Sequence, residues 1–265
     1  MLGAIIGDIV GSRFEWRNIK TKDFIFFADR CEFTDDTVMT LAIAAALVEW
    51  QQKKGSLQKK VIKKMQRFGR LYPYAGYGGM FSNWLASSNP TPYNSYGNGA
   101  AMRISSVAYA GNTLDQVKDL SWQVTAVTHN HSEGIKGAEA TAVAIFLART
   151  GKKLAEIKSV IEKEYYPLND TLDEIRPTYR FNETCQGTVP QALLAFFQSV
   201  SFEDAIRNAV SLGGDSDTIA AICGSVAEAY YGIPSSIKER AFTYLDNNLI
   251  KIIDEFCQSY GSYNK

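Results

Sequence analysis

The chain has 265 residues, of which 46% are hydrophobic and 21% charged, the composition of an ordinary soluble globular protein with a sizeable core. Lys and Arg balance Asp and Glu at 28 each, so no excess of charge indicates a nucleic-acid or membrane-surface partner. No apolar run reaches the roughly eighteen residues of a membrane span, so we also expect no membrane partner.

The cysteines and the N-terminal stretch bear on the cellular compartment. The four cysteines are far apart and form no C-x-x-C pair, which indicates reduced thiols rather than a disulfide framework. The N-terminal stretch has no basic region and is interrupted by Asp8, so we expect no signal peptide. A cytoplasmic protein is therefore expected.

The first predicted helix contains three evenly spaced glycines. In GAIIGDIVGSRFE (3–15), Gly3, Gly7 and Gly11 are four residues apart and share one face of a helix. Because glycine has no side chain, we expect this face to allow close approach of a neighbouring backbone. The next apolar segment, DFIFFAD (23–29), has the composition of a strand, but a lone strand cannot make a sheet.

Helical patterns dominate the rest of the chain. Small apolar residues or amphipathic spacing, bounded by capping residues or glycine, predict helices over 37–54, 56–72, 113–128, 132–150, 201–214 and 217–232. No alternation of strands and helices occurs, which argues against a parallel α/β sheet.

Long loops separate some of these helices, at residues 72–84, 87–103 and 167–187. Loops of this length in a compact helical protein are more often functional than slack. We find no linker and no clean repeat. The sequence therefore predicts an all-α fold, one compact domain over residues 1–265 with orthogonally packed helices and long functional loops.

Two acidic motifs, FTDDT (33–37) and GGDSDT (213–218), each place two aspartates and a threonine at the start of an apolar helix. Helix capping explains one such motif, because Asp and Thr accept hydrogen bonds from free N–H groups. Capping does not explain four carboxylates at two buried helix ends, because unpaired buried carboxylates repel one another. With no cationic cluster nearby, divalent metal is the expected counter-charge, and oxygen ligands favour Mg²⁺ or Mn²⁺. Two helix starts that meet would form a two-metal site.

Other metal-dependent sites fit less well. The only histidines are His129 and His131, and no cysteines are paired, so a usual zinc site cannot be assembled. A phosphatase-type D-x-D-x-T motif should follow a buried strand, which is absent here. A terpene-synthase D-D-x-x-D motif would need an acid where this chain has Met39.

Two further acids belong to the first predicted helix. Asp8 and Glu15 are seven residues apart, two turns along one face. We interpret Asp8 as a buried, hydrogen-bonded structural aspartate. For Glu15, a solvated helix end and a role at the metals are both open.

A glycine loop, NSYGNGAAMR (94–103), precedes another helical pattern. Glycines turn backbone N–H groups inward and a helix N-terminus favours an anion, so this loop is suited to a pyrophosphate. It matches neither the P-loop nor the dinucleotide fingerprint. Of the two histidines, His129 is the better candidate for contact with a ligand and His131 the weaker.

Taken in order, GDIVGSRFE, FTDDT, YGNGAAMR, TH before a small-residue helix, and GGDSDT resemble the motifs of the ADP-ribosylglycohydrolase family. The resemblance covers about residues 3–232. It implies an all-α fold with a binuclear Mg²⁺ or Mn²⁺ centre that removes ADP-ribose from a modified acceptor. The metal ligands it implies are Thr34, Asp35, Asp36, Asp215, Asp217 and Thr218.

The same resemblance implies residues that hold the substrate. The loop that holds the diphosphate and the adjoining ribose matches Ser95, Tyr96, Gly97, Asn98 and Gly99. The histidine of the ADP-ribose pocket matches His129. Glu15 matches a glutamate that reaches the metals and swings away when substrate enters. The short spacing from Glu15 to Asp35 indicates a reduced loop near the substrate mouth, and residues 187–199 give no match for acceptor recognition.

The expected reaction is hydrolysis by a water that two metals activate, with Asp36 or Glu15 as general base. The expected acceptor is an ADP-ribosylated protein or small molecule, arginine-linked in preference, with ADP-ribose as product and a monomeric enzyme. Two alternatives remain open. One is a non-catalytic ADP-ribose-binding or structural protein of this fold, and the other is a hydrolase of ADP-ribosylated nucleic acid or small molecules.

Overall fold

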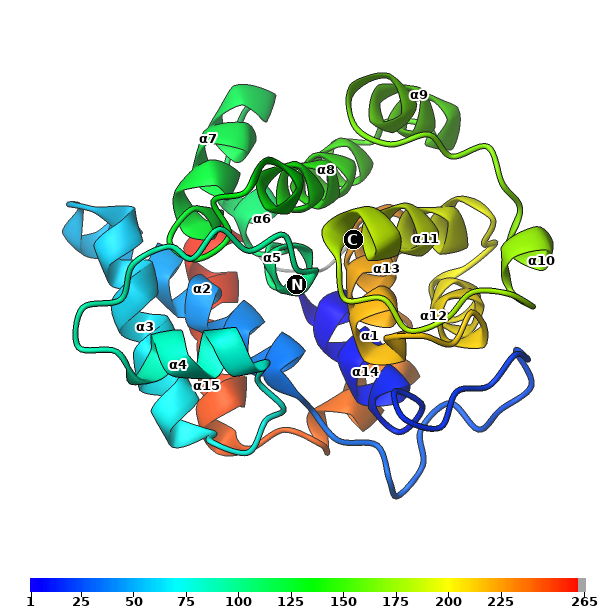
Figure 1. Cartoon of the computed structure of the whole chain (residues 1–265), viewed down its shortest axis with the longest axis horizontal. Helices are drawn as coiled ribbons and strands as arrows, with labels where there is room; N and C mark the ends of the chain where they lie inside the picture. The colour runs from blue at the N-terminus through cyan, green and yellow to red at the C-terminus, as the bar shows by residue number, and fades with distance from the viewer. Residues whose placement is uncertain (262–265) are drawn as a thin grey trace.

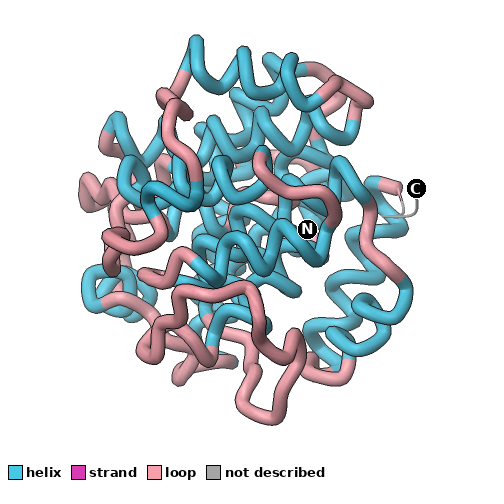
Figure 2. Tube along the Cα trace, turned by 90° about the vertical axis from the view of Figure 1, so that its right-hand side faces the viewer, coloured by secondary structure: helices cyan, strands magenta, loops and turns pink. Residues whose placement is uncertain are grey.

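Residues 1–261, the part of the chain that the computed structural model describes, form fifteen helices and no β-strand (Figures 1 and 2). The helices are α1 (Leu2–Ser12), α2 (Asp35–Lys53), α3 (Leu57–Leu71), α4 (Gly79–Ala86), α5 (Gly99–Met102), α6 (Val107–Ala110), α7 (Leu114–Thr125), α8 (Ser132–Arg149), α9 (Leu154–Glu164), α10 (Leu172–Ile175), α11 (Cys185–Phe197), α12 (Phe202–Ser211), α13 (Ser216–Tyr231), α14 (Ser235–Phe242) and α15 (Asn247–Tyr260). The predicted all-α class, a single compact helical domain, is confirmed.

The six helices predicted beyond α1 are all present, with ends within three residues of the expected ones. Capping residues explain this agreement. The Thr113 hydroxyl accepts a hydrogen bond from the Gln116 amide (3.2 Å) at the start of α7. Ser201 does the same for the Asp204 amide (3.1 Å) at the start of α12. Such caps satisfy backbone donors that the helix itself leaves free.

Helix α1 lies at the centre of the molecule against α13 (Figure 1). Its glycine face makes this contact: a Cβ on Gly7 would lie 2.0 Å from the Ala220 carbonyl oxygen, and one on Gly3 would lie 2.1 Å from that of Gly224. No side chain can occupy such a gap, so only glycine allows the two backbones to come this close. The close approach expected from the sequence is confirmed.

The first helix is shorter than predicted. Helix α1 ends at Ser12, so Glu15 lies in the following turn and not on the helix. The Ser12 hydroxyl bonds back to the Ile9 carbonyl (3.0 Å), and the Asn18 side-chain amide donates to the carbonyls of Phe14 and Glu15 (2.7 and 2.9 Å). These polar side chains satisfy backbone groups at the helix end and fix the turn instead.

Several helices were not predicted, among them α4, α9, α14 and α15. Helix α11 is the clearest case, because it begins inside the predicted loop 167–187 and includes residues that the sequence left unassigned. Thr184 caps it by accepting from the Gly187 amide (3.1 Å), and Pro190 stands in its second turn. Its buried residues surround the helix, so no amphipathic period marked it in the sequence.

The structure also bears on the predicted lone strand, the cysteines and the absence of a membrane span. Residues 23–29 are irregular and join no sheet. None of the four cysteines forms a disulfide in the part of the chain that the structure describes, in agreement with the predicted reduced thiols. None of the helices within residues 1–261 has both the length and the hydrophobicity that crossing a bilayer requires.

Candidate active site

The starts of α2 and α13 meet in the interior, as the paired acidic motifs led us to expect. The Thr218 hydroxyl of α13 donates a hydrogen bond to Asp36 Oδ2 of α2 over 3.2 Å. Thr34 precedes α2 as its N-cap, and its hydroxyl accepts from the Asp36 amide (3.4 Å). Asp215 holds the corresponding place before α13 without a side-chain cap bond. Its carboxylate is therefore free for other partners.

Five acidic side chains, which we call the acid cluster, gather around this meeting point. They form two groups of three, in each of which one carboxylate oxygen per residue lies within 4.8 Å of the others. The groups are Asp8 with Asp36 and Asp217, and Glu15 with Asp215 and Asp217. Asp217 belongs to both groups. These carboxylates would suit two divalent cations, with Asp217 within reach of both.

Asp8 is the member of the cluster that accepts the most hydrogen bonds from the protein. It is fully buried and accepts hydrogen bonds from the Thr34 amide (2.9 Å), the Thr34 hydroxyl (2.7 Å), the Thr37 amide (3.0 Å) and the Thr37 hydroxyl. The prediction of a hydrogen-bonded structural aspartate is confirmed. Asp8 ties α1 to the start of α2, which places Asp36.

The rest of the cluster lacks counter-charge from the protein. Asp36 Oδ1 is buried without any hydrogen-bond partner. Within residues 1–261, no Lys or Arg forms an ion pair with an acid of the cluster. Burial, followed by the charges of neighbouring aspartates, raises the pKa of Asp36 and of Asp217 well above the usual range. An orphaned carboxylate oxygen beside mutually repelling acids fits a bound divalent cation.

Asp35 and Glu15 lie at the edge of the cluster and are partly exposed. Burial and the neighbouring carboxylates raise the pKa of each to about 7. Asp35 was predicted as a metal ligand, but it falls outside both groups of three acids. The other predicted ligands outside these groups are the threonines Thr34 and Thr218. The Asp35 amide donates to the Ala75 carbonyl (2.7 Å), so the loop after α3 lies directly over it.

The predicted substrate loop is tied to the acid cluster through Asn98. The buried Asn98 side chain donates to Asp215 Oδ2 (2.6 Å) and to the Thr188 hydroxyl (3.1 Å), while its backbone amide donates to the Glu183 carbonyl (2.7 Å). The backbone amide of Gly97 also has a partner, because it donates to Ser95 Oγ (3.1 Å). The backbone amides of both Gly97 and Asn98 are therefore already hydrogen-bonded. The loop is thus a rigid wall beside the acids.

A second buried assembly, the histidine pocket, consists of Arg103, Thr128 and His129. The Arg103 guanidinium, 1% exposed, donates to Thr128 Oγ1 (2.6 Å) and lies 3.1 Å from His129 Nδ1. A guanidinium has no acceptor, so Nδ1 accepts and the proton of the neutral ring is on Nε2. Burial and the Arg103 charge hold the pKa of His129 well below its usual range, which keeps the ring neutral.

The protonated Nε2 of His129 faces the glycine loop. A Cβ on Gly97 would lie 3.6 Å from this nitrogen, and one on Gly99 would lie 3.5 Å from it. The absence of side chains at these two positions leaves the nitrogen in contact range of a ligand on the loop. Tyr96 is 47% exposed beside it, with its ring 5.1 Å from that of His131. His131 caps α8 by accepting from the Glu133 amide (3.1 Å).

Sequence reasoning missed four residues that position the site: Asn18, Arg103, Thr128 and Thr188. Asn18 bonds to both the amide and the carbonyl of Gly214 (2.8 and 2.9 Å) and so joins the Glu15 turn to the start of α13. Its partner is 196 residues away, and no local pattern gives such a pairing. Arg103 and Thr128 did carry a signal, because they belong to the motifs YGNGAAMR and TH.

The sequence model of the ADP-ribosylglycohydrolase family matches residues 1–262. Among curated proteins, ADP-ribosylhydrolase ARH3 of Homo sapiens is 26% identical, with 94% of this chain and 90% of that protein covered. ADP-ribosylarginine hydrolase Tri1 of Pseudomonas putida is 25% identical, with 88% and 70% covered. A solved chain described as "ADP-ribosylglycohydrolase-related protein complex" has the same fold, with a TM-score of 0.72, 23% identity, and coverage of 99% of this chain and 96% of that one.

The family match extends over nearly the whole chain, and it includes both acidic motifs, the glycine loop and His129. The relatives named above are hydrolases and are covered over most of their length. The chain therefore belongs to the ADP-ribosylglycohydrolase family and is an enzyme.

Proposed function

We propose that this enzyme hydrolyses the glycosidic bond between ADP-ribose and a modified acceptor, with two divalent cations held by the acid cluster. One observation carries the proposal: two groups of three carboxylates share Asp217, and the buried Asp36 Oδ1 lacks a partner from the protein. When bound, Mg²⁺ or Mn²⁺ would lower the pKa of a water and neutralise charge that develops in the transition state.

The protein side chains have separate tasks in this proposal. Asp36, Asp215 and Asp217 hold the cations, and Thr34, Asp35 and Thr218 complete their surroundings. Glu15, which is partly exposed and has a pKa raised to about 7, is suited to accept a proton from the attacking water near neutral pH. Asp36 is the second candidate for this base.

The histidine pocket and the glycine loop would hold the ADP-ribose. His129 Nε2–H points a donor at the loop, where an anionic diphosphate would accept it. Asn98 keeps the loop at a fixed distance from Asp215. Binding energy from the diphosphate would in this way orient the sugar towards the acid cluster.

The bond that we propose as the first substrate to test is the one between ADP-ribose and an arginine side chain. The protonated guanidinium is a leaving group that needs little acid assistance, so this linkage demands least of the side chains of the site. The similarity to an ADP-ribosylarginine hydrolase supports this choice, while the similarity to ADP-ribosylhydrolase ARH3 leaves other linkages open.

The test is to incubate the protein with arginine-linked and serine-linked ADP-ribosyl peptides, in Mg²⁺, in Mn²⁺ and in EDTA, and to measure released ADP-ribose. Metal-dependent release from the arginine peptide supports the proposal, and release from the serine peptide alone corrects the linkage. Equal release in EDTA would overturn the metal mechanism. An Asp254→Asn variant, which alters an acid remote from the cluster on α15, serves as the matched control.

A further inference from the structure

The charge of this neutral chain is unevenly distributed. Residues 50–114 contain nine of its 28 Lys and Arg residues and none of its 28 Asp and Glu residues. The remaining 200 residues therefore carry 19 cations against 28 acids. An asymmetry of this size within a neutral protein indicates a surface for a polyanionic partner.

Most of these cations belong to α3, and four of them form one exposed stripe. The basic stripe consists of Lys59, Lys63, Arg67 and Arg70, all exposed, at intervals of four, four and three residues. The helical rise of about 1.5 Å per residue spaces them by roughly 4.5–6 Å. This interval is of the same order as the separation of phosphates along an extended nucleic-acid strand.

The stripe does not stabilise its own helix. It contains like-charge pairs four residues apart, and α3 has no acid in its first turn to favour the helix dipole. Helices α8, α9, α12 and α15 each contain a cation paired with an acid three or four residues away, as in Lys158–Glu162 and Arg207–Glu203. A solvated helix face is expected to resemble those helices and not α3.

Glu49 partners only the inner cations of α3. It lies 3.4 Å from Lys60 Nζ and 2.9 Å from Lys64 Nζ, and the Lys64 hydrogen bond lowers the pKa of Glu49 to about 2. Within residues 1–261 no acid pairs with a residue of the basic stripe. The outer charges are left for a partner.

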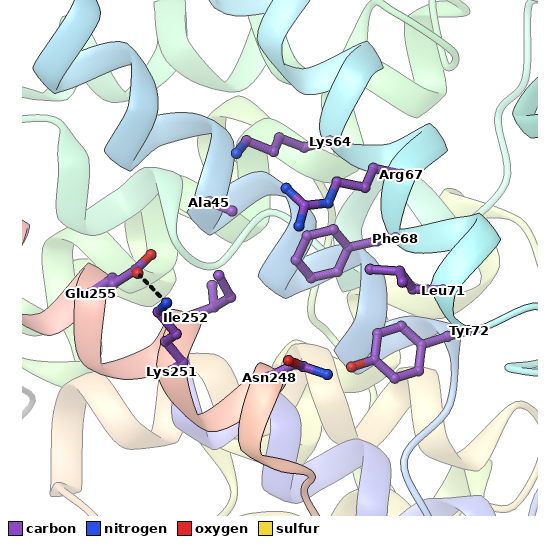
Figure 3. Close-up of a pocket in the computed structure, with 10 residues that line it drawn as sticks. All are labelled: Ala45, Lys64, Arg67, Phe68, Leu71, Tyr72, Asn248, Lys251, Ile252 and Glu255. Carbon is purple, nitrogen blue, oxygen red and sulfur yellow. Dashed lines mark ion pairs between the residues drawn. The ribbon is translucent and has the colours of Figure 1, made fainter.

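A groove of about 310 Å³ runs beside the stripe between α3 and α15 (Figure 3). Lys64 and Arg67 reach over one side of it, and Phe68 and Ile252 give it an apolar lining. The lining also includes Lys251 and Glu255, which pair over 3.9 Å, and Arg67 adds a positive charge that no acid of residues 1–261 pairs with. Apolar walls beside such a charge suit a planar base attached to a phosphate. Arg67 belongs to both the groove and the stripe, so one strand could contact both.

The stripe leads toward the active site. Arg70 is followed by Tyr74, which is 97% exposed, and then by Ala75, whose carbonyl accepts the Asp35 amide (2.7 Å). An exposed aromatic ring at the end of a row of cations offers a stacking surface for a base. Most apolar side chains of α3 are turned into the core and Leu71 alone among its leucines is exposed, so this face offers little to a lipid bilayer.

We infer that the basic stripe, the groove beside it and Tyr74 bind single-stranded nucleic acid next to the catalytic centre. Phosphates contact Lys59, Lys63, Arg67 and Arg70 in turn, and a base stacks on Tyr74. Binding at this surface does not depend on the hydrolytic step. If the proposed activity also holds, a modified group carried on the bound strand, or on a protein attached to it, is delivered to the acid cluster.

The test is fluorescence anisotropy with a fluorescein-labelled oligothymidylate of about twelve nucleotides. Binding is measured at NaCl concentrations from about 20 to about 200 mM, a range over which the screening of charges changes strongly. Four phosphate contacts predict a slope of log K against log salt of about −3. Neutralising the stripe (K59Q/K63Q/R67Q/R70Q) should weaken binding at least about tenfold and flatten this slope. Tyr74→Ala should weaken binding about fivefold with the slope unchanged.

The matched control removes the same charge elsewhere, in the variant K152Q/K153Q/K158Q/K163Q on and before α9. It should bind the oligonucleotide within about twofold of the wild type if the stripe is specific. Equal binding by the stripe variant, or no binding at 20 mM salt, overturns the inference. Equally tight binding of polyglutamate or of phosphatidylserine vesicles would assign the surface to an acidic protein or a membrane instead.

A hydrolysis assay of the stripe variant distinguishes strand binding from the proposed catalytic activity. The stripe variant should release ADP-ribose from a small ADP-ribosyl peptide at the wild-type rate, because none of its changed residues touches the acid cluster. Loss of strand binding with hydrolysis intact supports the inference. Strand binding by a protein without hydrolase activity would refute the proposed function alone.

Discussion

The acid cluster and the histidine pocket flank the same glycine loop, yet they bury opposite charges. The cluster holds carboxylates with no Lys or Arg beside them, and the pocket holds Arg103, for which no acid forms an ion pair within residues 1–261. Burial lowers the pKa of Arg103 to about 10, so it stays charged near neutral pH. A protein built only for stability would pair such charges with each other.

The comparison indicates that each region is completed by a ligand of opposite sign. Divalent cations fit the cluster, and the diphosphate of ADP-ribose fits the loop beside the pocket. Asn98 lies between the two regions. Its side chain donates to Asp215, and its backbone amide donates to the Glu183 carbonyl.

The largest effect is expected for Asp217→Asn, because this residue belongs to both carboxylate groups. Turnover should fall about a thousandfold, since charge stabilisation at the reacting centre is lost. The metal-free variant should melt no lower than the metal-free wild type, because one of several repelling charges is removed. Kinetics and thermal melting measure the two effects. Normal turnover in a folded variant would contradict the shared-ligand arrangement.

Glu15→Gln should lower turnover about a hundredfold and leave ADP-ribose affinity within about twofold. The reason is that Glu15 is partly exposed at the edge of the cluster, where it can exchange a proton with water. Calorimetric titration with ADP-ribose and steady-state kinetics separate binding from catalysis. If affinity falls as much as turnover, Glu15 acts in binding and not as a base.

Arg103→Met should weaken ADP-ribose binding about tenfold and destabilise the fold by about 2 kcal/mol, because Thr128 and His129 lose a charged donor. Imidazole nitrogen chemical shifts should show His129 leaving the Nε2–H tautomer. Arg103→Lys, which retains a donor, should restore part of the affinity. Lower stability with tautomer and affinity unchanged would leave Arg103 a purely structural residue.

The smallest effect is a dependence of the metal-free melting temperature on pH. Folding raises the pKa of Glu15 and Asp35 to about 7, above the values of 4.5 and 3.8 in the unfolded chain. The folded state therefore binds more protons, and stability falls as pH rises from 6 to 8. We expect a decrease of a few degrees, removed by Mg²⁺ or Mn²⁺. A decrease that persists with metal bound would place its origin outside the cluster.

The sequence predicted those parts of the fold and site that local chemistry determines. Capping residues and small apolar runs located α2, α8 and α13, and the glycine spacing of α1 predicted its contact with α13. The cost of burying four carboxylates without a counter-charge indicated a metal site if the two acidic motifs met, and the family resemblance implied that they do.

What the sequence missed depends on contacts between distant residues. Helix α11 is buried over most of its surface and has only a weak amphipathic period. The turn at Glu15 is fixed by Asn18, which also bonds to Gly214. The tautomer of His129 depends on Arg103, 26 residues earlier. The even overall charge concealed the basic stripe, because a sum over the chain carries no information about position.

One turn of α1 touches both of the helices that carry the acidic motifs. Asp8 holds the start of α2, and a Cβ on Gly11 would lie 2.5 Å from the Cα of Asp217. A single added methyl group at this position would force the backbone at Asp217 to shift relative to α1. Since Mg²⁺ tolerates distorted coordination less well than larger ions do, Gly11→Ala should shift the ion requirement toward larger cations. The choice of metal would then be tuned by a residue with no functional group.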